Sequence, residues 1–375
     1  MSPMSVAETG PALPRGLSSE DLTGHLYLGP AGIVAGTVSA LAALPLAGGP
    51  LAFADCRLWW RHDGAVREWL LPLPELRAWN AAEGAAAPVV ETLLQRLVRP
   101  RAAFAGLSLD RPRLMGVLNV TPDSFSDGGR FFGPDAAIAQ GQALLAVGAD
   151  ILDIGGESTR PGAEAVEPAE EMRRILPVIR ALAEKGAVIS VDTRHAAVMG
   201  AAVEAGAAII NDITALTGDA AALGVAAASG ASILLMHMQG EPASMQHEPR
   251  YDCAPLDVYD ILAARLAACQ SAGIPLDKLC VDPGIGFGKT LDHNLQILAR
   301  LALYHGLGVP ICLGVSRKSF IAKLLPGTST EHRLAGSLAA ALVGLQQGVQ
   351  LLRVHDVAET AQAVTVWRAA SAGQI

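Results

Sequence analysis

The chain has 375 residues, of which 51% are hydrophobic and 17% are charged, and its formal net charge is −8. This length and composition allow a large buried core and indicate two domains, or one large α/β domain with an extension. The acidic balance argues against a nucleic-acid partner, which usually needs a basic face. The acidic balance does not exclude an anionic small substrate, because a local cluster of basic side chains can override the total charge.

The five cysteines form neither a CxxC pair nor a zinc-ligand spacing, so we expect buried free thiols in a reducing cytoplasm. The N-terminus does not resemble a signal peptide, because Glu8 precedes the first basic residue, Arg15, and no early apolar core is present. Residues 26–54 carry no charge and could be a membrane span by length alone. Glycines and prolines interrupt this segment throughout, which favours short strands and turns in a small soluble domain.

The first 110 residues show no catalytic constellation, and we expect His25, His62 and Asp63 to be surface groups. Residues 1–17 are predicted to be disordered. The elements expected after them are short strands between residues 22 and 76, such as 56–61 and 65–71, then a linker or weak helix start at 81–87 and a helix at 89–98.

The character of the chain changes after Arg113, where apolar runs typical of buried strands alternate with helical stretches rich in alanine and leucine. The candidate strands are residues 114–118, 151–154, 187–191, 208–210, 232–236, 279–281, 310–314 and 351–354. The helices between them include residues 136–147, 168–185, 196–205, 257–272 and 332–347.

This alternation of strands and helices, without hairpin signals, implies parallel pairing of the strands. About eight such units in roughly 260 residues match a (β/α)₈ barrel. We therefore predict an α/β fold with a barrel over residues 111–375 and a small extension over residues 1–110. The alternative is a doubly wound open sheet. If that sheet bound a dinucleotide, it would carry a GxGxxG turn after an early strand, and the sequence has none.

Polar residues follow or close most of the predicted strands, at the face where barrel enzymes carry out their chemistry. One such residue alone is usually a helix cap, as Asp192 before Thr193 would be. Their repetition around the barrel predicts a site. Carboxylates and an amide in a pocket suit a flat, amide-like heterocycle, and the residues of this first subset are Asp192, Asn211, Asp282 and Lys318. A buried aspartate needs a partner, so either a ligand or Lys318 must supply one. The alternative is a purely structural Asp–Lys pair.

A second subset has the chemistry of an anion site, with phosphate or pyrophosphate as its natural guest. Its residues are Asn119, Arg160, Arg353 and His355. Arg353 and His355 lie two residues apart at one strand end, so their side chains point to the same side. An exposed pair at a strand edge is the alternative for these two.

Three loops could contribute to such a site. Residues 284–289 lack the Walker spacing, so we interpret their glycines as allowing the backbone to turn close to a ligand, with Phe287 as an aromatic wall. Residues 121–132 and 157–164 contain glycine, proline and polar side chains and could fold over substrates as lids. Ordinary connecting loops are the alternative for both.

Eight motifs in order resemble those of the dihydropteroate synthase family. They are LMGVLNVTPDSFSDGG, DILDIGGESTRPGAE, VDTR, IINDI, LLMHMQG, VDPGIGFGK, GVSRKSF and LLRVHDV, and they run from about Leu114 to the C-terminus. The resemblance implies a TIM barrel enzyme, the sulfonamide target of folate biosynthesis. Such an enzyme condenses 6-hydroxymethyl-7,8-dihydropterin pyrophosphate with 4-aminobenzoate, assisted by Mg²⁺, to give dihydropteroate and pyrophosphate.

The resemblance also implies roles for particular residues. The pterin would be held by Asp192, Asn211, Asp282 and Lys318, and the pyrophosphate by Asn119, Arg160, Arg353 and His355. Asn119 would ligate Mg²⁺, and Asp127 would approach the metal or the incoming amine. The aminobenzoate ring would be framed by Phe125, Thr159, Pro161, Phe287 and Ser316. The catalytic residues would be Asp127, Asp192, Lys318, Arg353 and His355.

In the implied mechanism the C–O bond to pyrophosphate breaks first, and the arylamine then attacks the methylene carbon. No nucleophilic side chain is needed. Arg194 stands where the family often has a smaller residue, and we expect it to point away from the pocket. The first 110 residues are too short for the pyrophosphokinase sometimes fused to this family. For them, a regulatory or oligomerisation module is our hypothesis.

Two alternatives to a synthase remain open. A pterin-dependent methyltransferase would share the barrel and the pterin-binding acids but has no use for a pyrophosphate site. A non-catalytic pterin-binding paralogue should have lost anion-site or first-loop residues, and this chain keeps Asn119, Asp127 and Arg160. We expect small-molecule substrates, a homodimer in the cytoplasm, and neither a nucleic-acid nor a membrane partner.

Overall fold

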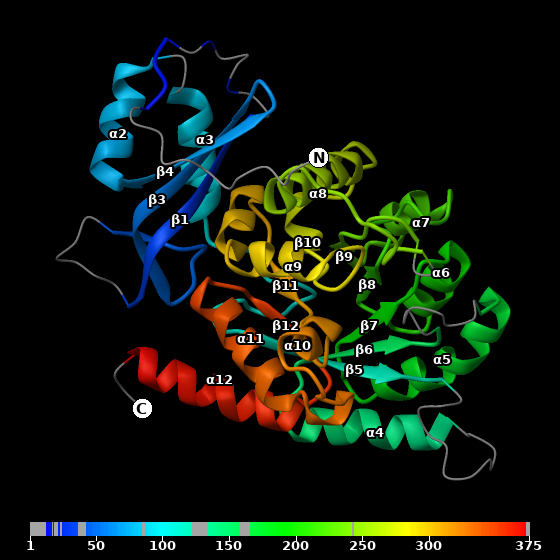
Figure 1. Ribbon diagram of the computed structural model, residues 1–375. Coiled ribbons are helices and arrows are strands. Elements are labelled where there is room, and N and C mark those ends of the chain that lie inside the picture. Colours follow the sequence, from blue (N-terminus) through cyan, green and yellow to red (C-terminus); the bar gives the residue numbers. More distant parts are fainter. Residues whose placement is uncertain are drawn as a thin grey trace.

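A computed structural model of the protein describes residues 13–16, 18, 22, 25–36, 43–84, 87–121, 134–157, 166–241 and 244–372. Two sheets organise these residues, a small antiparallel sheet near the N-terminus and an eight-stranded parallel sheet that forms the larger body. Figure 1 shows the small sheet and its two helices to one side of the larger body, next to α8 and α9. The prediction of disorder for residues 1–17 falls almost wholly outside the described residues.

The small sheet contains four strands: β1 (Leu26–Ala35), β2 (Leu44–Pro45), β3 (Leu51–His62) and β4 (Ala65–Pro72). β3 pairs antiparallel with each of the others. Asp63 and Gly64 join β3 to β4 with positive φ angles of 50° and 72°, the backbone of a two-residue type I′ hairpin turn. The side chains of His62 and Asp63 are exposed, as expected.

The expectation that these strands are short was wrong, because β1 has 10 residues and β3 has 12. Gly29 lies inside β1 instead of breaking it. A Cβ at this position would lie 3.0 Å from the Trp59 ring and 3.1 Å from the Cα of Leu303, so the glycine permits a close approach to the barrel. The described part of the charge-free segment is thus largely strand. No helix among the described residues is long and apolar enough to cross a membrane.

Two helices follow the small sheet, α2 (Leu73–Ala82) and α3 (Ala87–Val98). α3 agrees with the helix predicted at residues 89–98, and its buried Val90, Leu93, Leu94 and Leu97 join the core of the small sheet. α2 was missed, because the strand-like pattern was extended to residue 76. Its buried residues, Leu73, Leu76 and Trp79, pack in the same core.

The parallel sheet has the neighbour order β10-β9-β8-β7-β6-β5-β12-β11. Its strands are β5 (Arg113–Asn119), β6 (Ile151–Gly155), β7 (Ile189–Asp192), β8 (Ile209–Asp212), β9 (Ser232–Met236), β10 (Leu279–Asp282), β11 (Cys312–Leu313) and β12 (Leu351–Val354). A parallel bridge between Val281 and Ile311 joins the two end strands and closes the barrel. All eight predicted strands are present. β11 is shorter than predicted, because it pairs regularly with β12 only at Cys312 and Leu313.

Helices connect the strands around the outside of the barrel (Figure 1). The α-helices are α4 (Pro134–Ala146), α5 (Pro168–Ala183), α6 (Ala196–Glu204), α7 (Ala222–Ser229), α8 (Ala254–Ser271), α9 (Leu291–Leu298), α10 (Ser319–Leu324), α11 (Leu334–Gln346) and α12 (Val357–Ala372). The 3₁₀ segments among the described residues are η2 (Leu276–Lys278), η3 (Leu301–Leu307) and η4 (Thr330–His332). The five predicted barrel helices are all present. α8 begins at Ala254 rather than 257, with Pro255 in its first turn, where proline is well tolerated.

The N-terminal end of the barrel is filled by side chains that precede its first strand. Phe104 and Leu109 pack against inward residues of the strands, including Met115, Cys280 and Cys312. Cys56 and Cys269 are also buried and free, and Cys253 is half-buried. Apart from this exposure of Cys253, the prediction of buried free thiols is confirmed.

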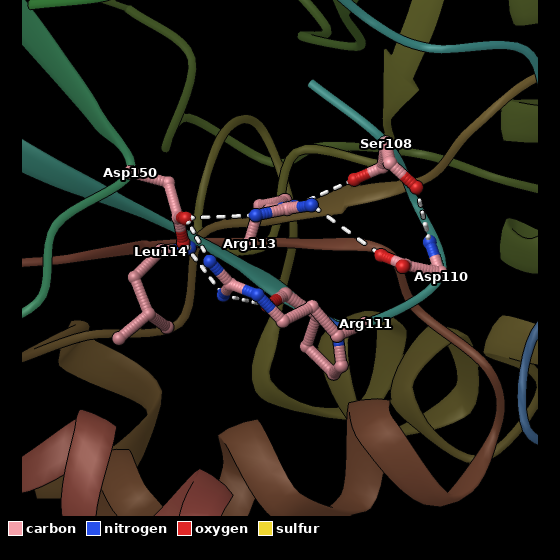
Figure 2. Close-up of polar contacts among 7 residues, drawn as sticks. Ser108, Asp110, Arg111, Arg113, Leu114 and Asp150 are labelled. Carbon is pink, nitrogen blue, oxygen red and sulfur yellow. Dashed lines mark hydrogen bonds and ion pairs between the residues drawn. The ribbon is translucent and has the colours of Figure 1, made fainter.

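Asp150 fastens the segment before β5 to the barrel (Figure 2). Its carboxylate accepts hydrogen bonds from the guanidinium groups of Arg111 and Arg113 and from the backbone N–H of Leu114, the last at 2.9 Å. These contacts fix the start of the first barrel strand. The division into an extension of residues 1–110 and a barrel of residues 111–375 stays a prediction.

Candidate active site

A pocket opens at the carboxyl ends of the barrel strands, and its empty space, including the open mouth, is about 350 Å³. Strand ends of β7, β8, β10 and β12 reach it, together with the segments that follow β10 and β11. The residues that line it are Asp192, Asn211, Ile213, Met236, Asp282, Gly284, Ile285, Phe287, Gly314, Lys318 and Arg353. The four residues of the first predicted subset therefore lie together in one pocket.

Arg353 is at the centre of the charges in this pocket. Its Nε donates to Oδ2 of Asp153 at 2.6 Å, and its Nη2 donates to Oδ2 of Asp192 at 2.6 Å. Burial raises the pKa of Asp192, and Asp153 and Asp212 raise it further, whereas Arg353 and Lys318 lower it. One guanidinium group is thus shared by two carboxylates and reduces the repulsion between them.

This arrangement adds a partner to the two expected for a buried aspartate, which were a ligand or Lys318. Within the described residues, the ion-pair partner of Asp192 is Arg353. Arg353 was assigned from the sequence to the anion subset, yet its guanidinium lies among the residues of the heterocycle subset. The two subsets therefore meet at this side chain.

Asp153 was not singled out from the sequence. It lies in the middle of β6, where its side chain is fully buried. Its carboxylate accepts a hydrogen bond from Nδ2 of Asn211 at 3.2 Å as well as the bond from Arg353. The available signal was a charged residue inside an otherwise apolar strand, since such a residue needs a charged or polar partner.

Asp282 and Lys318 also line the pocket. Oδ1 of Asp282 accepts the backbone N–H of Gly284 at 2.7 Å, and burial raises the pKa of this carboxyl. The Nζ of Lys318 lies 4.0 Å from the centre of the Phe287 ring, in a cation–π contact. Burial, with a smaller effect of Arg353, lowers the pKa of Lys318 to about 8.

The loop at residues 284–289 is held by Lys289, which is buried. Its Nζ donates to the carbonyl oxygens of Gly284 and Phe287, both at 2.9 Å, and lies 2.9 Å from Nδ1 of His237. Burial lowers the pKa of Lys289 well below its usual value and that of His237 to about 2. Lys289 and His237 thus support the loop, a role that the sequence did not assign to them.

Two glycines of this loop approach protein backbone closely, and the expected approach of the loop to a ligand stays a prediction. A Cβ on Gly284 would lie 1.9 Å from the carbonyl oxygen of His237, and one on Gly288 would lie 2.4 Å from that of Gln239. Both have positive φ angles, 68° and 59°. The glycines therefore allow the loop to pack against the segment after β9, while Phe287 lines the pocket as predicted.

His355 lies beyond Arg353, at the end of β12. Its Nδ1 is 3.1 Å from Oγ of Ser316, which also accepts the backbone N–H of His355 at 3.2 Å. Burial, together with Arg353, Arg317 and Lys318, lowers the pKa of His355 to about 4. His355 is therefore a neutral imidazole at physiological pH.

Asn119 ends β5, the neighbour of β12 in the barrel, and is half-buried. In the part of the chain that the structure describes, no group of three or more histidine, cysteine, aspartate or glutamate residues could hold a metal ion. An amide oxygen such as that of Asn119 is a suitable ligand for Mg²⁺, which commonly takes one or two protein ligands and fills the rest with water and phosphate oxygens.

Several predicted residues lie outside the described part of the chain. They are Phe125, Asp127, Thr159, Arg160 and Pro161. The two candidate lids fall almost entirely in the same two segments, and only their first residues, Thr121 and Glu157, are described.

Arg194 does not line the pocket. Its guanidinium donates to both carboxylate oxygens of Glu157, at 3.1 and 2.9 Å. Behind them, the carboxyl of Glu171 on α5 is fully buried. Burial raises the pKa of Glu171 to about 7, with Glu157 and Asp192 adding to the effect.

Comparisons with known proteins agree with this geometry. The sequence model of the family described as "Pterin binding enzyme" matches residues 115–355. The dihydropteroate synthase of Escherichia coli (strain K12) is 47% identical over 266 residues, covering 71% of this chain and 94% of that protein. The dihydropteroate synthase of Haemophilus influenzae is 44% identical over 264 residues, covering 70% and 95%.

Solved structures give the same result. The dihydropteroate synthase of Xanthomonas albilineans with 4-aminobenzoic acid is 49% identical and superposes with a TM-score of 0.68, covering 72% of this chain and 97% of that one. The same enzyme in complex with 7,8-dihydropteroate is 47% identical with a TM-score of 0.65, covering 71% and 96%.

The barrel, its pocket and the family match define a pterin-binding enzyme with a (β/α)₈ fold, as predicted. Within that class, the chain belongs to the dihydropteroate synthase family, the transferases of folate synthesis. The resemblance, fold class and type of activity expected from the sequence are thus confirmed.

Proposed function

We propose that the chain condenses 6-hydroxymethyl-7,8-dihydropterin pyrophosphate with 4-aminobenzoate, and that the pocket around Arg353 holds the pterin. The observation that carries this proposal is the gathering of Asp192, Asn211, Asp282 and Lys318 in one pocket. The chain's relatives named dihydropteroate synthase support the reaction. One structural neighbour of that name was solved with 7,8-dihydropteroate, the proposed product.

The polar groups of the pocket complement the edge of a pterin ring. Asp192 and Asp282 offer carboxylate oxygens to ring and exocyclic N–H groups, and Lys318 can donate to a ring carbonyl or nitrogen. Phe287 supplies an apolar wall for the flat ring. Because these groups are buried, a bound ring that lacks a matching donor would leave a buried acceptor unsatisfied, so the pocket discriminates strongly against such rings.

The pyrophosphate of the substrate would extend from this pocket toward the end of β12. Arg353 and His355 supply a guanidinium and a neutral imidazole there, and Arg160 is assigned to the same site by its motif. These groups would stabilise the negative charge that develops on the leaving group. His355 would act as a hydrogen-bond donor and not as a fixed charge.

Magnesium would be held by Asn119 together with oxygens of the pyrophosphate and water. When bound, the ion supplies positive charge that stabilises the departing pyrophosphate. We assign Asp127, by motif only, to a position near the metal or the amine.

The chemistry needs little from the protein beyond binding and charge. The C–O bond breaks with its electron pair leaving on pyrophosphate, and the resulting cation is delocalised into the dihydropterin. Asp192 and Asp282 favour that positive charge electrostatically. The arylamine nitrogen then attacks the methylene carbon and loses one proton to water or to the released pyrophosphate. Ser316 and Phe287 would frame the aminobenzoate with Phe125, Thr159 and Pro161.

Two further expectations belong to this proposal. Homodimer formation is implied by resemblance, and light scattering of the purified chain tests it. We also propose that the enzyme works in the cytoplasm, where free buried thiols such as Cys280 and Cys312 are stable.

A binding experiment tests the pocket directly. Asp282→Asn should weaken binding of the dihydropterin by about tenfold or more, because the carboxylate can no longer accept two strong hydrogen bonds. Asp277→Asn is the matched control, since Asp277 is exposed on η2 and does not line the pocket. Equal affinity of both variants for the pterin would contradict the proposed site.

A further inference from the structure

The small N-terminal sheet lies outside the family match, which begins at residue 115. Its described residues nevertheless contact the barrel on the side of α8 and η3. Tyr27 and Trp59 are buried in the barrel's hydrophobic core and not in the core that the sheet shares with α2 and α3. One edge of the contact between the sheet and the barrel consists of polar side chains. Their hydrogen bonds form a series that extends from the sheet toward the pterin pocket.

Arg61, near the end of β3, makes the polar contact to α8. Its Nη1 donates to Oδ2 of Asp260 at 2.9 Å, and its Nη2 donates to Oδ1 of Asp257. The hydroxyl of Tyr27 donates to the same Oδ2 of Asp260 at 2.9 Å. The Arg61 side chain is 27% exposed and that of Asp257 is 19% exposed, so water screens this pair less than it screens a surface ion pair.

Asp257 connects this contact to the loop before α8. While Oδ1 faces Arg61, Oδ2 accepts the backbone N–H groups of Asp252 at 2.8 Å and Cys253 at 3.0 Å. The carboxylate therefore fixes the backbone at the start of α8 from within the first turn of the helix. Arg61 holds that carboxylate in place from the other side.

Tyr251 precedes the two residues bound by Asp257. Its hydroxyl donates to the carbonyl oxygen of Gly288 at 2.8 Å. Its ring packs edge-on against His293, with centroids 4.8 Å apart, and lies 6.0 Å from the ring of His237. Tyr251 thus joins the start of α8 to the glycine-rich loop.

That loop forms one wall of the pocket. Gly288 follows Phe287, whose ring lies beneath the ammonium of Lys318. A shift of the Gly288 carbonyl would move the Phe287 ring and with it the wall against which the pterin packs. Lys289 and the close approach of Gly284 to His237 leave the loop little freedom to correct such a shift.

We propose that Arg61 is a positioning residue for the pterin pocket. The N-terminal sheet would hold the pocket wall in place through Arg61, Asp257, Tyr251 and the carbonyl of Gly288. This inference rests on the proposed placement of the pterin beside Phe287. It gives the extension a role in substrate affinity, which a purely structural anchor would not have.

Kinetics of single variants provide the first test. Arg61→Ala and Tyr251→Phe should each raise the KM for the pterin pyrophosphate about threefold to tenfold, with a smaller change in kcat. The KM for 4-aminobenzoate should also rise, because Phe287 would frame that ring too. Arg57→Ala is the matched control, because Arg57 lies on the same strand and forms its ion pair with Glu68 of β4 rather than with α8. The control should leave all three constants unchanged.

The double variant tests whether the two residues act through one chain of contacts. If they do, adding Arg61→Ala to Tyr251→Phe should change the KM for the pterin by less than about twofold. Effects that multiply in full, or an unchanged KM in Arg61→Ala, would overturn the inference.

Hydrogen exchange of the full-length protein separates this inference from the proposed site. Arg61→Ala should speed exchange of the backbone at residues 284–289 in the absence of substrate, and Arg57→Ala should not. Unchanged exchange would overturn the contact chain whatever the kinetics show. Faster exchange in Arg61→Ala, combined with wild-type pterin affinity in Asp282→Asn, would instead overturn the proposed site and with it the positioning role.

Discussion

Arg353 on β12 and Asp192 on β7 form an ion pair with 2.6 Å between Nη2 and Oδ2, inside the proposed pterin pocket. By motif, Asp192 belongs to the pterin and Arg353 to the pyrophosphate. Neither can take a ligand as its main partner without loosening this pair. Pterin N–H groups that replace the guanidinium at Asp192 would free Arg353 for the leaving group, so the two halves of the substrate should assist each other in binding.

Arg353→Ala should lower kcat/KM for the pterin pyrophosphate by about 100-fold or more. The variant removes a buried charged donor that would contact the pyrophosphate and that also pairs with Asp192, which would hold the pterin. It should also cost about 3 to 5 kcal/mol of folding free energy, since Asp153 and Asp192 lose their shared cation. Steady-state kinetics and denaturant unfolding measure the two effects. Unchanged turnover would remove Arg353 from the site.

Asp153→Asn should raise the KM for the pterin about tenfold while leaving the KM for 4-aminobenzoate within about twofold of wild type. The amide keeps the shape of the side chain but holds Arg353 and Asn211 less firmly. Thermal unfolding should change little, because Arg353 keeps Asp192 as a partner. Equal effects on both substrates would indicate that Asp153 supports the barrel in general and not the pterin subsite.

The pH dependence of kcat/KM should show a fall above about pH 8, which reports Lys318 in the free enzyme. The ammonium is the donor form, and it is lost as the pH rises through the lowered pKa. His355, with its pKa near 4, stays neutral throughout and should contribute no step between pH 5 and 8. Lys318→Met should remove the alkaline fall, and Lys323→Met, at an exposed lysine of α10, should keep it.

Glu171→Gln should make the protein more stable at pH 8 by about 1 to 3 kcal/mol. Burial raises the pKa of Glu171 from 4.5 to about 7, so the folded protein binds more protons than the unfolded chain between these values. Stability from this group therefore falls as the pH rises through that window. Denaturant unfolding at pH 4 and pH 8 should show a benefit of the substitution only at pH 8, and a benefit independent of pH would contradict the assignment.

The barrel could be predicted from the sequence because parallel strands buried on both faces form short apolar runs, and all eight runs were visible. The site could be predicted in outline because polar residues end those runs. Position along the strand, however, does not say which charges pair. Asp153, in the middle of β6, and Lys289, in a glycine-rich loop, became visible only through their buried contacts.

The N-terminal sheet was harder to predict. The long strand β1 contains glycine and proline, whose usual role as breakers was overridden by pairing with β3 and by close packing against η3. The polar contacts of Arg61 depend on residues about 200 positions away, at Asp257 and Asp260. Contacts between residues so far apart in the chain produce no recognisable pattern in the local sequence.

The measurement that tests the account most directly is pyrophosphate release by the purified full-length chain, supplied with the dihydropterin pyrophosphate and Mg²⁺, with and without 4-aminobenzoate. The account predicts release that depends on 4-aminobenzoate and is lost in Arg353→Ala. A folded protein that binds the pterin but releases no pyrophosphate would contradict it and would identify a non-catalytic pterin-binding paralogue.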